Sequence, residues 1–158
     1  MPPLESREIE MAYIPSGAQW YLADLVIEIR VEEDPRSVVH INTVLVHANS
    51  PIEAFEKSLL LGAEQVGDPY LNPAGKRVDS RFVGLKDLAV IHDQLEHGAE
   101  LFFVEMTDVK PDAIPTLVKT RDNLSVFFEI SPTDGPDYSS GQIAADYKKA
   151  SGQGRNAV

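Results

Sequence analysis

Alternating apolar and polar positions mark the first third of the chain. Between residues 20 and 30 every second position is apolar, and these positions are Tyr21, Ala23, Leu25, Ile27 and Ile29. A period of two is typical of a strand that buries one face. Residues 38–48 are rich in Val, Ile and Thr and predict a second strand. Because only a short acidic turn containing Pro35 separates the two strands, we expect an antiparallel hairpin.

A helix signal follows the hairpin. Ser50 and Glu53 have the spacing of a capping box, and Pro51 suits the first helical position. Apolar residues then recur at near-helical spacing and predict the buried stripe of the helix, which consists of Ile52, Phe55, Leu59, Ala63 and Val66. Gly67 and Pro69 predict its end.

Further strands and a second helix are predicted in the second half of the chain. The strand patterns cover residues 76–84, 100–106 and 125–130. Asp87 suits the N-cap of a short helix that runs to Leu95, with Gly98 after its end. We therefore expect an α+β fold in the order β-β-α-β-α-β plus an added C-terminal strand. Its mostly antiparallel sheet of four to five strands would have the helices on one face.

The chain is expected to hold a single domain, since 158 residues match the usual size of one core. We place a flexible leader at residues 1–18, the α+β domain at residues 19–130 and a polar tail rich in Gly and Ser at residues 131–158. The first residues are acidic and contain no apolar run, so no signal peptide is predicted. No stretch approaches the roughly 18 apolar residues of a membrane span.

Charge and composition narrow the possible partners. The chain has 25 Asp and Glu against 14 Lys and Arg, a net charge of −11. This charge repels nucleic acid and anionic membranes, so we expect neither as a partner, whereas an acidic surface suits a protein partner. The chain has no cysteine, which excludes disulfides, thiolate metal sites and thiol catalysis. We expect a cytoplasmic protein without a cofactor.

A local basic cluster is the first candidate site. It interrupts the acidic sequence and consists of Lys76, Arg77, Arg81 and Lys86. Arg77 and Arg81 are expected on one face of a strand, where they could bind a carboxylate or phosphate. Alternatively, they form cross-strand ion pairs with Asp24 or Glu28. Trp20 is a further ligand-binding candidate. Adjacent strand residues point to opposite faces, so Trp20 lies on the face of the sheet opposite the buried face that carries Tyr21.

A histidine-rich segment is the second candidate site. His92 and Glu96, and likewise Asp93 and His97, have the i, i+4 spacing that can chelate a metal ion from a helix. The alternative is an ordinary solvated helix end, which needs no metal. We expect no tight metal site, because no third ligand is in sight.

Two motifs resemble those of a known family. The sequence WYLADL at residues 20–25 resembles the opening motif of the bacterial domain-of-unknown-function family 4288, and RFVGLKDL at residues 81–88 resembles its second motif. The helix predicted between them is similar in place and character. The resemblance covers residues 20–106 and implies no catalytic residues.

Apolar residues on both faces of the predicted sheet indicate an interface. The second face of the first strand includes Trp20, Leu22 and Val26. Amphipathic helices cover only one face of a sheet, and an exposed apolar face usually binds something. We therefore expect a homodimer that involves the sheet. The alternative is that Val126, Phe128 and Ile130 fold back over this face within one chain.

Two functions remain open. No phosphate-binding loop, dinucleotide motif or nucleophile elbow is present. The sequence therefore favours a non-catalytic protein-interaction module. The alternative is a binder of a small anionic ligand, or an enzyme, that uses Arg77, Arg81 and a histidine.

Overall fold

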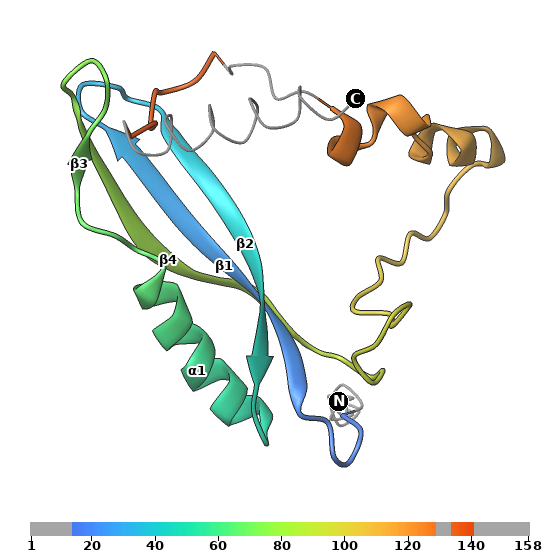
Figure 1. Cartoon of the computed structure of the whole chain (residues 1–158). Helices are drawn as coiled ribbons and strands as arrows, with labels where there is room; N and C mark the ends of the chain where they lie inside the picture. Colours follow the sequence, from blue (N-terminus) through green and yellow to red (C-terminus); the bar gives the residue numbers. More distant parts are fainter. Residues whose placement is uncertain (1–13, 129–133, 141–158) are drawn as a thin grey trace, which may run out of the picture.

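The computed structural model describes residues 14–128 and 134–140, in which a sheet and one α-helix form the folded body (Figure 1). The elements of this body are β1 (Trp20–Val31), β2 (Ser37–His47), α1 (Pro51–Glu64), β3 (Tyr70–Leu71) and β4 (Arg77–Val90). The strands lie in the order β2-β1-β4-β3, and every neighbouring pair is antiparallel. This confirms the α+β class with a four-stranded antiparallel sheet. No helix in the described ranges has the length and hydropathy to cross a membrane.

β1 and β2 form the predicted hairpin. Their register is regular from Trp20 opposite His47 to Arg30 opposite Ser37. The predicted alternation is also confirmed, because the buried face of β1 consists of Tyr21, Ala23, Leu25, Ile27 and Ile29. β1 lies between β2 and β4 and therefore supplies the centre of the core.

β4 is longer than predicted and takes the place of the second helix. The strand expected at residues 76–84 is confirmed, but the chain stays extended to Val90 instead of turning into a helix at Asp87. Two register shifts against β1 introduce bulges. As a result, the core-facing residues of β4 are three positions apart, at Phe82, Leu85 and Leu88. The helix predicted through Leu88, Ile91 and Leu95 is wrong, because residues 87–90 pair with β1 and no helix follows Val90.

α1 begins as predicted. The hydroxyl Oγ of Ser50 accepts a hydrogen bond of 3.1 Å from the backbone N–H of Glu53. In return, Oε2 of Glu53 accepts a bond of 3.0 Å from the backbone N–H of Asn49. The capping box therefore satisfies backbone donors that the first turn leaves free.

The face of α1 that meets the sheet is not the predicted one. Its buried residues are small and four positions apart, at Ala54, Ser58 and Gly62. The predicted stripe faces outward instead, with Ile52 73%, Phe55 48% and Leu59 38% exposed, and only Val66 beyond the helix packs on the core. Large side chains on the sheet occupy the space, so the residues of α1 that are fully buried are small, and Leu61 packs beside them partly buried.

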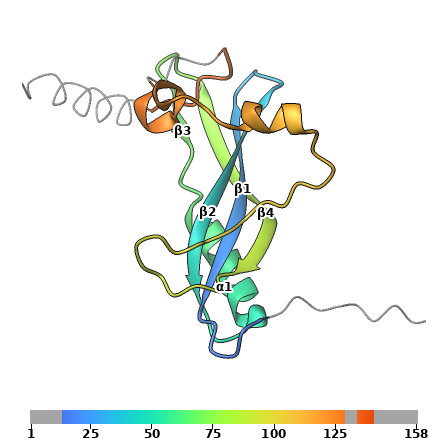
Figure 2. The same cartoon turned by 90° about the vertical axis from the view of Figure 1, so that its right-hand side faces the viewer.

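Two strands predicted beyond β4 do not form. Residues 100–106 and 125–128 contain no strand, and residues 129–130 of the second prediction lie outside the described residues. Residues 91–110 contain no helix or strand, and three short 3₁₀ helices follow at Pro111–Leu117, Arg121–Asn123 and Ser125–Phe127. We call residues 104–128 the arm. Figures 1 and 2 show that the three 3₁₀ helices stand away from the sheet, so residues 125–128 have no strand of the described sheet beside them.

Part of the predicted tail packs on the far end of the sheet. The Tyr70 hydroxyl donates to the backbone carbonyl of Tyr138, and Asn72 Nδ2 donates to that of Asp137 at 2.9 Å. Burial raises the pKa of the Tyr70 hydroxyl. Residues 134–140 therefore extend the core beside the turn at residues 72–75, where Gly75 adopts a φ of 78°.

Candidate functional site

The face of the sheet opposite α1 is the first candidate surface. We call it the open face, because α1, the one α-helix of residues 14–128 and 134–140, packs on the other side. Its apolar part follows β2 and the adjoining side of β1, and it consists of Trp20, Leu22, Val26, Val39, Ile41 and Leu45. Val39, Ile41 and Leu45 are 54%, 48% and 46% exposed. The Asp24–Thr43 pair divides these apolar residues into two groups. Exposed apolar groups of this kind mark an interaction surface.

The remainder of the open face is charged and paired within the chain. The Glu28 carboxylate accepts a hydrogen bond of 3.0 Å from Arg81 Nη2, and Arg30 Nε lies 2.5 Å from its other oxygen. The hydrogen bond from Arg81, helped by the charge of Arg30, holds the pKa of Glu28 below its usual value. Arg77 Nε pairs with Asp79 at 3.0 Å. The charged part of this face therefore follows β4 and the adjoining end of β1 at Glu28 and Arg30, whereas the apolar part follows β2 and the first half of β1.

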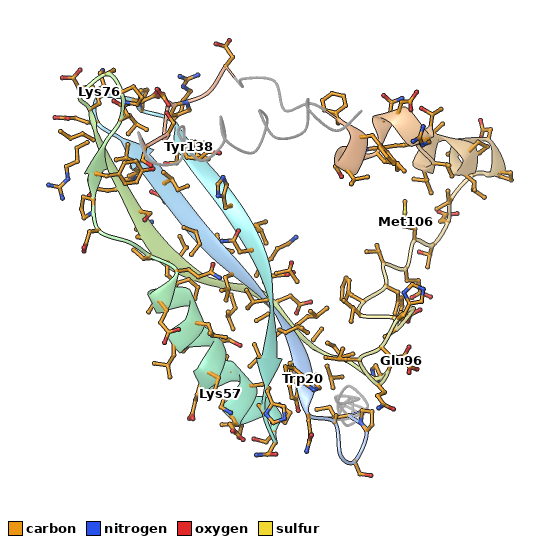
Figure 3. All side chains as sticks on the ribbon, in the orientation of Figure 1. Trp20, Lys57, Lys76, Glu96, Met106 and Tyr138 are labelled. Atoms are coloured by element: carbon orange, nitrogen blue, oxygen red, sulfur yellow. The ribbon has the colours of Figure 1, made fainter. Side chains whose placement is uncertain are left out.

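The candidate ligand residues lie at opposite ends of the sheet. Trp20 begins β1, and its ring meets the ring of His47 edge-on with the centroids 4.8 Å apart. Arg77 lies at the other end, because its neighbour Val78 pairs with Val31. Eleven strand residues, or roughly 35 Å, separate the two ends. Figure 3 shows this separation for Trp20 and Lys76, the residue before Arg77.

One arginine of the basic cluster forms the cross-strand ion pair that the second interpretation predicts, whereas Arg77 pairs with Asp79 of its own strand. Arg81 bridges to Glu28 across the strands, as expected for a charged ladder. Asp24, the other expected partner, instead accepts a hydrogen bond of 2.6 Å from Thr43 Oγ1. The register places no histidine beside Arg81 on the open face, since its cross-strand neighbours are Glu28 and then Val39.

The histidines do not converge either. His40 faces the core side of β2, where its ring meets that of Tyr138 edge-on at 5.4 Å, whereas His47 faces the open side. His92 and His97 follow β4 in a segment that contains no helix, so the i, i+4 geometry with Glu96 and Asp93 does not form. Asp93 Oδ2 accepts a hydrogen bond of 2.9 Å from the N–H of Glu100. Within residues 14–128 and 134–140, no three His, Asp or Glu side chains are placed to hold a metal ion.

Among the hollows near the end of the sheet where β1 begins, two are mostly apolar. One of about 330 Å³ follows the end of β4 and is mostly apolar, with Tyr21, Leu88, Val90, Leu101, Phe103 and His92 among its lining residues. The other, of about 380 Å³, lies between β2 and α1 and is lined by Trp20, Leu45, Leu60 and Lys57 among others. Both linings are mostly apolar, so both hollows are suited to receiving apolar groups.

The sequence reasoning missed the second hollow because it assigned the wrong face of α1 to the core. Leu60 is 65% exposed and borders the edge of β2, and Lys57 Nζ donates to the backbone carbonyl of His47 at 2.9 Å. Figure 3 shows Lys57 and Trp20 at the same end of the molecule. The row of small residues at a spacing of four in α1 was the available signal, since such a row permits close packing.

Comparison with known proteins agrees with the motif resemblance. The family model described as Domain of unknown function (DUF4288) matches residues 20–103, which span the whole sheet and α1 and end before the arm. Comparisons with curated proteins and with solved structures find no match. The matched segment makes up more than half of the 158 residues. The chain therefore belongs to the DUF4288 family.

Proposed function

We propose that this chain is a non-catalytic protein-interaction module that forms a homodimer through its sheet. The observation that carries the proposal is the apolar part of the open face, where Val39, Ile41 and Leu45 remain about half exposed. Burying apolar surface stabilises a complex by about 25 cal/mol for each Å² removed from water. A second copy offers the same surface and is always available to the first.

The exposed arm supports the same proposal. The alternative in which the chain after Met106 covers its own sheet is not seen in the described residues, since Val126 is 82% and Phe128 60% exposed. Most large apolar side chains of the arm are exposed, and they include Met106, Ile114, Leu117, Val118, Leu124 and Phe127. Two apolar surfaces in one chain that do not meet each other favour contacts between chains.

Binding of an anionic ligand has less support. Arg77 and Arg81 already pair with Asp79 and Glu28, so a ligand would have to displace a carboxylate from each guanidinium. Trp20, the third candidate, lies at the other end of β1.

Light scattering of the untagged full chain at micromolar concentration tests the homodimer. We expect twice the chain mass of 17.4 kDa. Leu45→Asn should shift the mass toward 17.4 kDa, whereas Leu71→Asn should not, because Leu71 is exposed on β3, away from the apolar part of the open face. A wild-type mass near 17.4 kDa at all accessible concentrations would contradict the proposal.

A further inference from the structure

β2 is an open edge of the sheet with an uncommon composition. It pairs with β1 on one side, and none of the described residues pairs with its other side. Its sequence, SVVHINTVLVH, contains no charged residue and no proline, although 25% of the residues in the chain are charged. Natural edge strands are usually protected by lysine, proline, bulges or short length. β2 has 11 residues in regular register and none of these protections.

The second long edge of the sheet is protected in the expected way. Past the short pairing with β3, β4 carries Asp79, Arg81, Lys86 and Asp87. Two register shifts interrupt its pairing with β1, and Gly84 adopts a φ of 151°. Bulges and charges discourage another strand from adding to this edge. Of the two long edges, only β4 is therefore protected against the addition of another strand, and β2 is the edge with which another strand can pair.

Along its outer edge, away from β1, β2 presents backbone donors and acceptors with which no described strand pairs. The N–H of Ala48 donates to the carbonyl of Gln19 at 2.9 Å, which sets the alternation of hydrogen bonds toward β1. By that alternation, even-numbered residues of β2 bond to β1, and the peptide groups that point away belong to Val39, Ile41, Thr43 and Leu45. Lys57 covers the end of this edge through its bond to the carbonyl of His47.

We propose that β2 pairs antiparallel with β2 of a second copy, so that the two sheets join into one continuous sheet across a two-fold axis. This inference rests on the proposed homodimer and specifies how it is built. Complete overlap of Ser37–His47 with its symmetry mate places Asn42 on the axis. Val39 then faces Leu45 of the second copy on the open face, and Val38 faces its Val46 on the core side.

The lack of charge identifies a second copy as the occupant. A two-fold axis brings identical strands together, so any charged residue near the axis would meet its own kind. Two chains of net charge −11 also repel each other, except along a neutral surface. Where the two β2 strands would meet, Val39, Ile41 and Leu45 make the open face apolar. The core side carries the polar residues His40 and Asn42 there, and Asn42 Nδ2 donates to Gln65 Oε1 at 2.9 Å.

Cysteine cross-linking tests the axis directly, because the chain has no native cysteine. Facing residues of an antiparallel pair have Cα atoms about 4.5–5.5 Å apart, within the range of a disulfide. Asn42→Cys should therefore form an intermolecular disulfide on mild oxidation. Val39→Cys alone should not, but Val39→Cys combined with Leu45→Cys should. Val83→Cys on β4 is the control of matched exposure, at 52% against 54% for Val39.

Two substitutions at Ile41 test the pairing independently. Ile41→Pro removes an N–H that points away from β1, so the monomer should keep its circular dichroism while the mass falls to 17.4 kDa. If this variant does not fold, Ile41→Lys decides, since it keeps the backbone and puts a charge at the seam. A dimer that survives these changes, or that cross-links at Val83→Cys but not at Asn42→Cys, would overturn β2 pairing and leave the homodimer standing. A monomeric wild type would end both proposals.

Discussion

The ring of Phe82 in β4 lies directly against Gly62 in α1. A Cβ atom built on Gly62 would overlap three carbons of that ring, closer than van der Waals contact allows. No other residue type fits here without a shift of the helix or the ring, so this contact sets how closely α1 approaches the sheet.

Gly62→Ala should therefore destabilise the fold. Alanine favours a helix over glycine by about 1 kcal/mol, but overpacking a core costs about 1–3 kcal/mol, so we expect a net loss. Urea unfolding measures it. Gly67→Ala is the control, since no atom lies within 4 Å of its added Cβ, and it should be neutral or slightly stabilising. Phe82→Leu in the Gly62→Ala background should recover part of the loss. Equal stability of Gly62→Ala and the wild type would show that the ring moves freely.

Ser50→Ala should weaken the start of α1. The substitution removes the acceptor of the Glu53 N–H and should lower the free energy of unfolding by about 0.5–2 kcal/mol. Ser50→Asp keeps an acceptor at this position and should retain most of the stability. Denaturant melts of the three proteins compare these values, and an unchanged midpoint for Ser50→Ala would contradict the capping role.

Acid should destabilise the hairpin turn through Asp34. Hydrogen bonds from Arg36, first from its side chain and then from its backbone, lower the pKa of Asp34 from 3.8 to about 2. Because the folded-state pKa lies below the unfolded one, this stabilisation is present above about pH 4 and is lost as the pH falls through about 2.

Asp34→Asn should therefore reduce the loss of stability across that window. Unfolding midpoints measured between about pH 4 and about pH 2 give the comparison. Asp68→Asn, an exposed substitution in the loop after α1, should leave the pH profile of the wild type unchanged. Identical acid profiles for Asp34→Asn and the wild type would rule out the contribution of this turn.

The purified untagged protein should contain no stoichiometric metal. His92 and Glu96 lack the helix that would align them, and Asp93 already accepts the N–H of Glu100. A tight site normally needs three or four protein ligands. Elemental analysis should find the same trace content in the wild type and in His92→Ala. Zinc or nickel at one atom per chain, lost in that variant, would refute the prediction.

The hairpin and the start of α1 could be predicted because local chemistry decides them. Alternation in β1 and the pair Ser50 and Glu53 act over a few residues, so the correct elements follow from sequence spacing. The presence of an apolar second face could be predicted for the same reason. Successive side chains of a strand alternate between the two faces of the sheet, so the face of each residue follows from its position in the strand.

Tertiary structure decided the features that depend on distant partners. The bulged β4 has a helix-like spacing at Phe82, Leu85 and Leu88, and only the long β1 beside it keeps this segment extended. The buried face of α1 was likewise set by the large side chains opposite it, which exclude the stripe of Ile52 and Phe55. Strand order placed β2 at the edge, where its neutral sequence has consequences that spacing alone does not reveal. Local patterns determine which secondary structures a segment can adopt. Which of these structures forms depends on distant segments, because side chains cannot overlap and backbone hydrogen bonds must be completed.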